Sequence, residues 1–340
     1  MKKTLIALAA VAASSAAFAQ SSVTLYGSLD LSLESVKGDK SVTRVTSGNH
    51  TTSRFGVKGV EDLGGGLKAK FNLEAPINAD TGEVKGNFWN RQAWLGLQGG
   101  FGELRLGRQD TPIGAIAGNT SLLGGQAYDD FKIAGTLAGD GARRTDNAVT
   151  YILPKLADGL TATLQYSTKL SGNEVANDDE GKHYGLSVQY AANGFGAGLG
   201  YVNAKNNANG NDKLKGLLVY GSYDFGMTKV TAYYNRDTDS TAAEKAKLYG
   251  VRFDVPVSET FALQASLSKS KDNTQAANVN DDDATIVALK GTYSLSKRTA
   301  VYGLFTNVSN DKASNLSVAA VANTADKSSR GFAVGVVHKF

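Results

Sequence analysis

The chain has 340 residues, of which 41% are hydrophobic and 20% charged, with a formal net charge of +4. It contains no Cys and three His, which excludes disulfide scaffolds, thiolate metal sites and cysteine nucleophiles. No stretch approaches the roughly 20 apolar residues of a membrane-spanning helix, while 39 Gly, 14 Tyr and 4 Pro favour an all-β chain with many tight turns. Such a composition fits a soluble β-protein or a membrane β-barrel, because a barrel exposes only alternate residues to lipid.

Residues 1–19 have the organisation of a secretory signal peptide. Lys2 and Lys3 precede an apolar stretch from Leu5 to Ala13, and residues 17–19 read Ala-Phe-Ala before Gln20. The stretch is too short to remain as a membrane helix. We therefore expect a cleaved signal peptide at 1–19 and one domain at 20–340. Cleavage removes two positive charges from the net +4, and the small remainder gives no reason to expect a nucleic-acid partner.

After the signal peptide, one repeated unit fills the chain. In each segment, one set of alternate residues is apolar or aromatic and the other is polar or small, which predicts β-strands. In one segment, for example, Phe261, Leu263, Ala265 and Leu267 alternate with Ala262, Gln264 and Ser266. The sixteen segments are 23–32, 52–60, 67–75, 89–97, 103–109, 147–153, 160–168, 183–191, 195–203, 215–224, 228–236, 247–256, 260–269, 285–294, 299–307 and 331–340.

The connections between these segments alternate between short and long. Short links such as 61–66, 99–102, 192–194 and 295–298 are rich in turn-forming residues. The eight long links are 33–51, 76–88, 110–146, 169–182, 204–214, 237–246, 270–284 and 308–330. Eight long and seven short links are what a 16-stranded outer-membrane barrel requires, with short turns on the periplasmic side and long loops outside.

A soluble β-sandwich is the alternative fold, since its strands also alternate. Sandwich strands are usually about five to six residues long and pack large aliphatic side chains into a core. The segments here are longer, and aromatic residues stand near their ends, as in the interface girdles of membrane barrels. The last segment places Phe332, Val334, Val336, His338 and Phe340 on one face and ends on an aromatic residue. We expect Phe340 to act as a C-terminal assembly signal for an outer-membrane barrel.

Several motifs together resemble the general trimeric porins of β-proteobacteria. They follow one another along the whole chain, at residues 22–27, 53–59, 90–97, 101–109, 146–151 and 337–340. The resemblance implies a 16-stranded antiparallel transmembrane β-barrel whose third external loop folds into the pore. It also implies a homotrimer in the bacterial outer membrane, in contact with lipid and lipopolysaccharide, through which small anions and hydrophilic solutes diffuse.

The alternation also predicts which charged side chains face the channel. If the apolar positions face lipid, the intervening positions line the lumen. The expected lumenal set is mostly basic and consists of Arg54, Lys58, Lys68, Lys70, Arg105, Arg252 and Lys290 against Glu74 and Asp254. Basic rings favour anions because a low-dielectric wall focuses the field into the pore, so the sequence predicts weak anion selectivity.

The resemblance also points to a constriction site. Trimeric porins narrow where arginines on the barrel wall face acidic residues on the third loop, and motif matches carry this role to Arg54, Arg91 and Arg144. Arg143 stands beside Arg144 and makes that match less direct. Arg108 also matches a motif, but it has the parity of the lipid-facing residues, so it either faces outward or follows a bulge.

The third long link, 110–146, supports an inward loop independently. It carries apolar residues such as Ile113, Ile116 and Phe131 but few charges, which predicts that it packs against the barrel wall. Asp129 and Asp130 are the candidates for the acidic side of the constriction.

Three functional classes remain to be compared. An outer-membrane enzyme needs an activated nucleophile or a carboxylate next to a base, and no His has such a partner at a recognisable spacing, so we expect no catalytic site. A substrate-specific porin or a surface adhesin remains the alternative, although no run of aromatic residues is found on the lumenal positions. We expect a passive channel without metal or cofactor.

Overall fold

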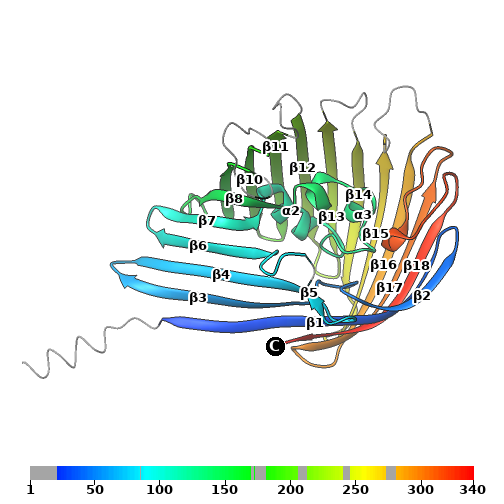
Figure 1. Cartoon of the computed structure of the whole chain (residues 1–340), viewed down its shortest axis with the longest axis horizontal. Coiled ribbons are helices and arrows are strands. Elements are labelled where there is room, and N and C mark those ends of the chain that lie inside the picture. Colours follow the sequence, from blue (N-terminus) through cyan, green and yellow to red (C-terminus); the bar gives the residue numbers. More distant parts are fainter. Residues whose placement is uncertain are drawn as a thin grey trace, which may run out of the picture.

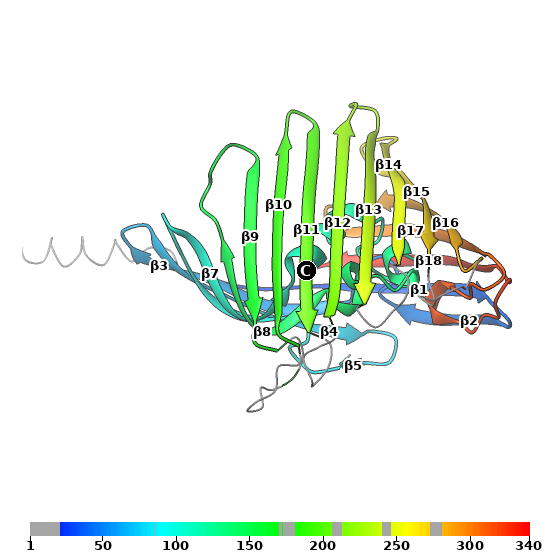
Figure 2. The ribbon, with the colours of Figure 1, turned by 90° about the horizontal axis from the view of Figure 1, so that it is seen from above.

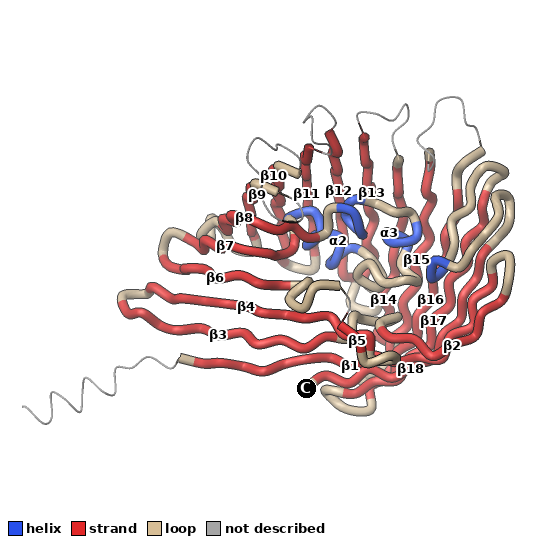
Figure 3. The backbone as a smooth tube through the Cα atoms, viewed as in Figure 1, coloured by secondary structure: helices blue, strands red, loops and turns tan. Residues whose placement is uncertain are grey.

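The computed structural model describes residues 21–84, 86–169, 172, 181–205, 213–239, 246–272 and 281–340. The expected signal peptide lies outside the described residues. Most of the described chain is β-strand, and Figure 3 shows the few helical turns in blue. Among the described residues, no helix is long and apolar enough to cross a membrane.

Sixteen antiparallel strands in the described part of the chain form a closed barrel, as the sequence predicts (Figures 1 and 2). Each expected segment overlaps one of these strands. They are β1 (Ser22–Lys37), β3 (Arg54–Gly64), β4 (Leu67–Asn78), β6 (Gln92–Gly99), β7 (Gly102–Asp110), β8 (Arg144–Ile152), β9 (Leu160–Ser167), β10 (His183–Ala192), β11 (Phe195–Lys205), β12 (Lys213–Asp224), β13 (Lys229–Asp239), β14 (Lys247–Pro256), β15 (Phe261–Lys271), β16 (Ala284–Ser294), β17 (Thr299–Asn310) and β18 (Ser329–Lys339).

Two further strands extend the loops and are not part of the sixteen. β2 (Ser41–Ser47) folds back on the second half of β1, and β5 (Glu83–Val84) pairs with the end of β4. A short 3₁₀ turn, η2 (Val318–Ala320), lies between β17 and β18. The first long link therefore forms a hairpin, which residues 48–53 follow. Residues 48–53 turn into the barrel, where the backbone amides of His50 and Thr51 donate to Asp30 Oδ2.

The barrel closes between its first and last strands. β1 pairs with β18 from Ser28↔Lys339 to Lys37↔Arg330, while the other edge of β1 pairs with β3 and β2. Beyond β18, Phe340 exchanges two backbone hydrogen bonds with Gly27, at 3.0 and 3.1 Å. The C-terminal residue therefore completes the seam.

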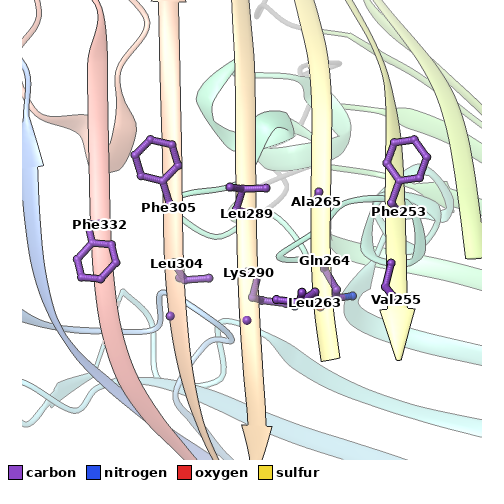
Figure 4. Close-up of a pocket in the computed structure, with 12 residues that line it drawn as sticks. Phe253, Val255, Leu263, Gln264, Ala265, Leu289, Lys290, Leu304, Phe305 and Phe332 are labelled. Atoms are coloured by element: carbon purple, nitrogen blue, oxygen red, sulfur yellow. The ribbon is translucent and has the colours of Figure 1, made fainter. Parts of the chain in front are cut away.

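The alternation in the sequence becomes an outer apolar surface and a polar lumen. On β1, Leu25 and Leu33 are exposed on the outside, whereas Asp30 and Glu34 are buried inside. A shallow depression of about 410 Å³ lies on the outer surface where Gly291 and Gly303 pair directly. Figure 4 shows the apolar and aromatic side chains around it, from strands β14 to β18. This surface suits lipid chains.

The inward loop, residues 111–143, connects β7 and β8 and lies inside the barrel (Figures 1 and 2). It contains α2 (Pro112–Thr120), α3 (Asp130–Ile133) and a π-helical turn, η1 (Leu137–Gly141). Thr111 caps α2 by accepting a hydrogen bond from the Gly114 amide at 3.1 Å, and Pro112 suits the first helical position. The loop is thus an ordered structure with its own capped helix.

Two apolar clusters hold the inward loop against the wall. Ile113, Ile116 and Phe131 pack on the lumenal side chains of Val202 and Leu218. A second cluster joins the loop to the closing strands through Leu122, Leu123, Tyr128, Ile286, Leu304 and Val318. Full burial of one such side chain contributes about 2 kcal/mol relative to exposure to water. The predicted packing of an apolar third loop inside the barrel is confirmed.

Candidate functional site

The narrowing made by the inward loop lies beside an arginine cluster, Arg54, Arg91 and Arg144. Arg54 is the first residue of β3, Arg144 is the first residue of β8, and Arg91 immediately precedes β6. The strands β3, β4, β6, β7 and β8 are neighbours in the sheet, so these separate motifs meet on one side of the lumen.

Two carboxylates join the cluster. Glu74, on the lumenal side of β4, forms ion pairs with Arg54, at 3.4 Å from its Nε atom, and with Arg91. Asp110, the last residue of β7, lies 3.0 Å from Arg144 Nε, and Gln92 donates to its other oxygen at 2.9 Å. Because three guanidinium groups stand against two carboxylates, the cluster keeps a net positive charge.

Arg143 and Arg144 take different directions. Arg144 points to Asp110. The Arg143 guanidinium lies against the glycines of the inward loop, so close to Gly125 that a Cβ on this glycine would stand 2.5 Å from Arg143 Nη1. Both cations therefore lie near the narrowing, and the sequence-based choice of Arg144 did not include its neighbour. The Asp110 carboxylate was also missed, because the expected segment 103–109 stops one residue before it, whereas β7 continues to Asp110.

Arg108 keeps the regular alternation of β7. This residue pairs across from Ala93 on the outward-facing row, and its guanidinium forms an ion pair with Asp146 and donates to Asn90. Arg108 therefore does not join the arginine cluster.

Asp129 and Asp130, the candidates for the acidic side of the constriction, are fully buried. Asp129 caps α3 and accepts from the backbone amide of Leu123 at 2.7 Å, and Asp130 accepts from the hydroxyl of Tyr233 on β13. Burial and the adjacent Asp130 carboxylate raise the pKa of Asp129 to about 7, and burial also raises the pKa of Asp130. In this structure the two residues hold the loop, and Glu74 and Asp110 are the acidic groups beside the arginines.

The remaining expected lumenal residues form two groups. Arg252 and Lys290 face inward but bind the back of the inward loop, through the carbonyl oxygens of Ser121 at 2.6 Å and Leu122 at 3.3 Å. Lys58, Lys70 and Arg105 lie near the short turns of β3, β4, β6 and β7. Lys68 lies one lumenal position nearer the turn than Lys70.

Two histidines have structural environments inside the barrel. His50 stacks on Tyr302 at 5.0 Å between ring centres, and burial together with nearby lysines lowers its pKa to about 4, so it is uncharged at neutral pH. His183 is buried between Gln165 and Thr145, at 3.0 and 3.3 Å. His183 is therefore held by hydrogen bonds within the wall, and His50 by its stacking on Tyr302.

Comparison with known proteins identifies the family. A family model described as Gram-negative porin matches residues 4–313. The chain belongs to the Gram-negative porin family. It is a channel protein of the bacterial outer membrane and not an enzyme.

Individual relatives agree with this assignment. The porin is 34% identical to outer membrane porin protein 32 of Delftia acidovorans and 28% identical to an outer membrane porin protein of Bordetella pertussis, with both chains covered completely in each case. Among solved structures, an anion-selective porin from Comamonas acidovorans has a TM-score of 0.83 and 28% identity, covering 94% of this chain and 100% of its own. OmpT of Vibrio cholerae in a trimer form shares the fold, with a TM-score of 0.66, 20% identity and coverage of 95% and 100%.

Proposed function

We propose that this porin forms a weakly anion-selective channel for passive diffusion of ions and small hydrophilic solutes. The observation that carries the proposal is the arginine cluster beside the inward loop, where Arg54, Arg91 and Arg144 outnumber Glu74 and Asp110. In a narrow pore with low-dielectric walls, such an excess attracts anions and repels cations. The description of the Comamonas relative as anion-selective supports the same reading.

The proposal includes the assembly of the channel. We propose that residues 1–19 direct export and are removed, and that the mature chain forms a homotrimer surrounded by outer-membrane lipid and lipopolysaccharide. The exposed apolar side chains of the barrel wall, among them Leu25, Leu95 and Phe332, supply a surface that a bilayer or a neighbouring protomer would cover.

Swelling of proteoliposomes tests the permeation part of the proposal. Vesicles containing the purified porin are diluted into a small monocarboxylate anion or an ammonium cation of similar size, each with a permeant counter-ion, or into a neutral amide of similar size. The anion should enter fastest and the cation slowest. Faster entry of the cation would contradict the charge assignment, and no swelling in any solute would contradict the channel itself.

A further inference from the structure

A second basic group lies on the lumenal wall, between the arginine cluster and the short turns. A hollow of about 260 Å³ there is lined by Lys58, Lys70, Asn72, Trp94 and Arg105, with Val60 beside them. Cross-strand pairing places these residues in two adjacent lumenal rows, one through Lys58, Asn72 and Trp94 and the other through Val60, Lys70 and Arg105. We call this site the basic hollow.

The basic hollow carries an excess of positive charge. Glu103 pairs with both Lys70, at 2.7 Å, and Arg105, at 2.5 Å. Lys58 stands 5.0 Å above the ring of Tyr26 and forms no ion pair with a carboxylate in the described residues. The basic hollow therefore has three cations and one carboxylate beside them, and only two of the cations are paired with it. An anion that enters the hollow neutralises part of this excess positive charge.

Apolar surface lies directly beside these cations. The Arg105 guanidinium lies 4.2 Å from the ring centre of Trp94, whose N–H donates to Gln92 at 2.9 Å. These contacts hold the indole in place, and Arg105 donates from Nε to Glu103 while it lines the hollow. Val60 is 37% exposed on the lumenal side and adds an aliphatic wall. The arginine cluster, in contrast, is surrounded by polar partners such as Thr51, Thr52 and Gln92.

The combination selects the chemistry of the ligand. Chloride or another small inorganic anion gains only electrostatic attraction in a hydrated pore, and it gains nothing from Trp94 or Val60. An organic carboxylate places its charge near Lys58 and Arg105 while its apolar body covers the indole and the valine, which adds apolar burial and π contacts. We propose that the basic hollow is a binding site for small organic carboxylates, in particular aromatic monocarboxylates. This inference rests on the proposed passage of anions through the channel, and it names the chemical class of anion that the channel binds.

Tyr26 connects the basic hollow to the arginine cluster. Its hydroxyl lies 2.8 Å from Asn72 Oδ1 and 2.9 Å from Glu74 Oε2, within donating distance of either acceptor, and Glu74 in turn binds Arg54 and Arg91. A carboxylate that leaves the cluster therefore meets Lys58 next along the same wall. The two sites form successive anion positions on one path.

The fluorescence of Trp94 tests the binding site directly. The chain has two tryptophans, and Trp89 packs between Phe88 and Phe55, at 4.6 and 6.0 Å, so Trp89→Phe leaves Trp94 as the single reporter. Benzoate is titrated at constant ionic strength against chloride and against benzyl alcohol. We expect a saturable change with benzoate and none with the other two. A linear response, or equal responses to benzoate and benzyl alcohol, would overturn the proposal.

Two matched lysine variants locate the site. In the Trp89→Phe background, Lys58→Gln should weaken benzoate binding by about threefold, as for loss of one solvent-accessible ion pair. Lys68→Gln removes a lumenal lysine that does not line the hollow and should leave the affinity unchanged. Equal effects of the two variants would mean that the positive charge of the whole pore attracts benzoate, and would overturn a binding site at the basic hollow.

The reversal potential in a KCl gradient separates this proposal from the one on which it rests. An anion-selective channel whose Trp94 does not respond to benzoate contradicts the basic hollow alone. A cation-selective channel contradicts the proposed function, whatever the fluorescence shows.

Discussion

Arg54 and Arg91 share the carboxylate of Glu74, so their charges act on the pore as a unit. A unit charge about 10 Å from an ion in water contributes about 0.4 kcal/mol, or roughly a factor of two in ion occupancy. Because each charge acts in opposite directions on chloride and potassium, the double variant Arg54→Ser and Arg91→Ser should lower the ratio of chloride to potassium permeability at least about fourfold. Reversal potentials of planar bilayers measure the ratio, and Arg108→Ser, which removes an arginine outside the cluster, is the control. An unchanged ratio in the double variant would mean that these arginines do not control selectivity.

Individual residues also show the limit of reasoning from alternation. Lys58, Lys70 and Arg105 lie on regular strands, so alternation alone predicts their lumenal positions. Asp110 was missed because the expected segment ends at residue 109, and Arg108 lies on the outward-facing row that its parity indicates. Trp94 was missed because it is a single aromatic residue on a lumenal row, and its role depends on Arg105 from the next strand.

Among the elements, the inward loop depends on small residues in the strands behind it. Glycines occupy alternate positions of β11, and a Cβ on Gly200 would meet the Cα of Ile113 at 2.9 Å. The sequence shows these glycines as one side of an alternating strand, but only the fold shows that α2 rests on Gly200. The side chains of Val202 and Leu218 are apolar although they occupy lumenal positions, because they pack against the inward loop.

Substitution of Gly200 should disturb the seating of α2. Gly200→Val places a branched side chain against Ile113, so the loop cannot keep its position, and single-channel recordings should show several conductance levels in place of one. Gly221→Val adds the same side chain where no atom lies within 4 Å and should retain the wild-type level. A single wild-type level in both variants would contradict the close packing of α2.

The buried pair Asp129 and Asp130 predicts a pH dependence of the loop. Burial raises both pKa values, that of Asp129 to about 7, above the usual value of about 4 for an exposed Asp. The docked loop therefore favours the protonated form. The stability that this contributes is complete below about pH 4 and is lost as pH rises toward 7.

Channel recordings between pH 4.5 and 8 measure this effect. Current fluctuations of the wild-type channel should increase severalfold as pH rises, because the docked loop becomes less stable. Asp129→Asn removes one titrating group and should remove most of the dependence. Fluctuations that decrease with rising pH, or that titrate equally in Asp129→Asn, would contradict the assignment.

For the whole molecule, the number of strands, their order and their outward faces followed from the sequence, because lipid on one side and a hydrated lumen on the other impose a period of two. The position of the acidic residues did not follow. The sequence makes Asp129 and Asp130 candidates for the acidic side of the constriction, whereas their burial depends on Tyr233, a hundred residues away.

Closure of the barrel gives a prediction for assembly. The backbone of Phe340 pairs with Gly27, and its ring occupies the space that a Cβ at residue 27 would need. Deletion of Phe340 should reduce the yield of folded barrel in the outer membrane severalfold, whereas Phe340→Tyr should retain it. Heat-modifiable migration on SDS gels measures the folded fraction, and equal yields from the deletion and the wild type would contradict the role of this residue in assembly.

The reversal potential of the purified wild-type porin in planar bilayers, across a tenfold KCl gradient, tests the central claim most directly. Because cations outnumber carboxylates along the lumenal wall, we predict a modest preference for chloride that falls as salt rises, since added ions screen the wall charges. A preference for potassium, or a selectivity that does not change with salt, would contradict the account.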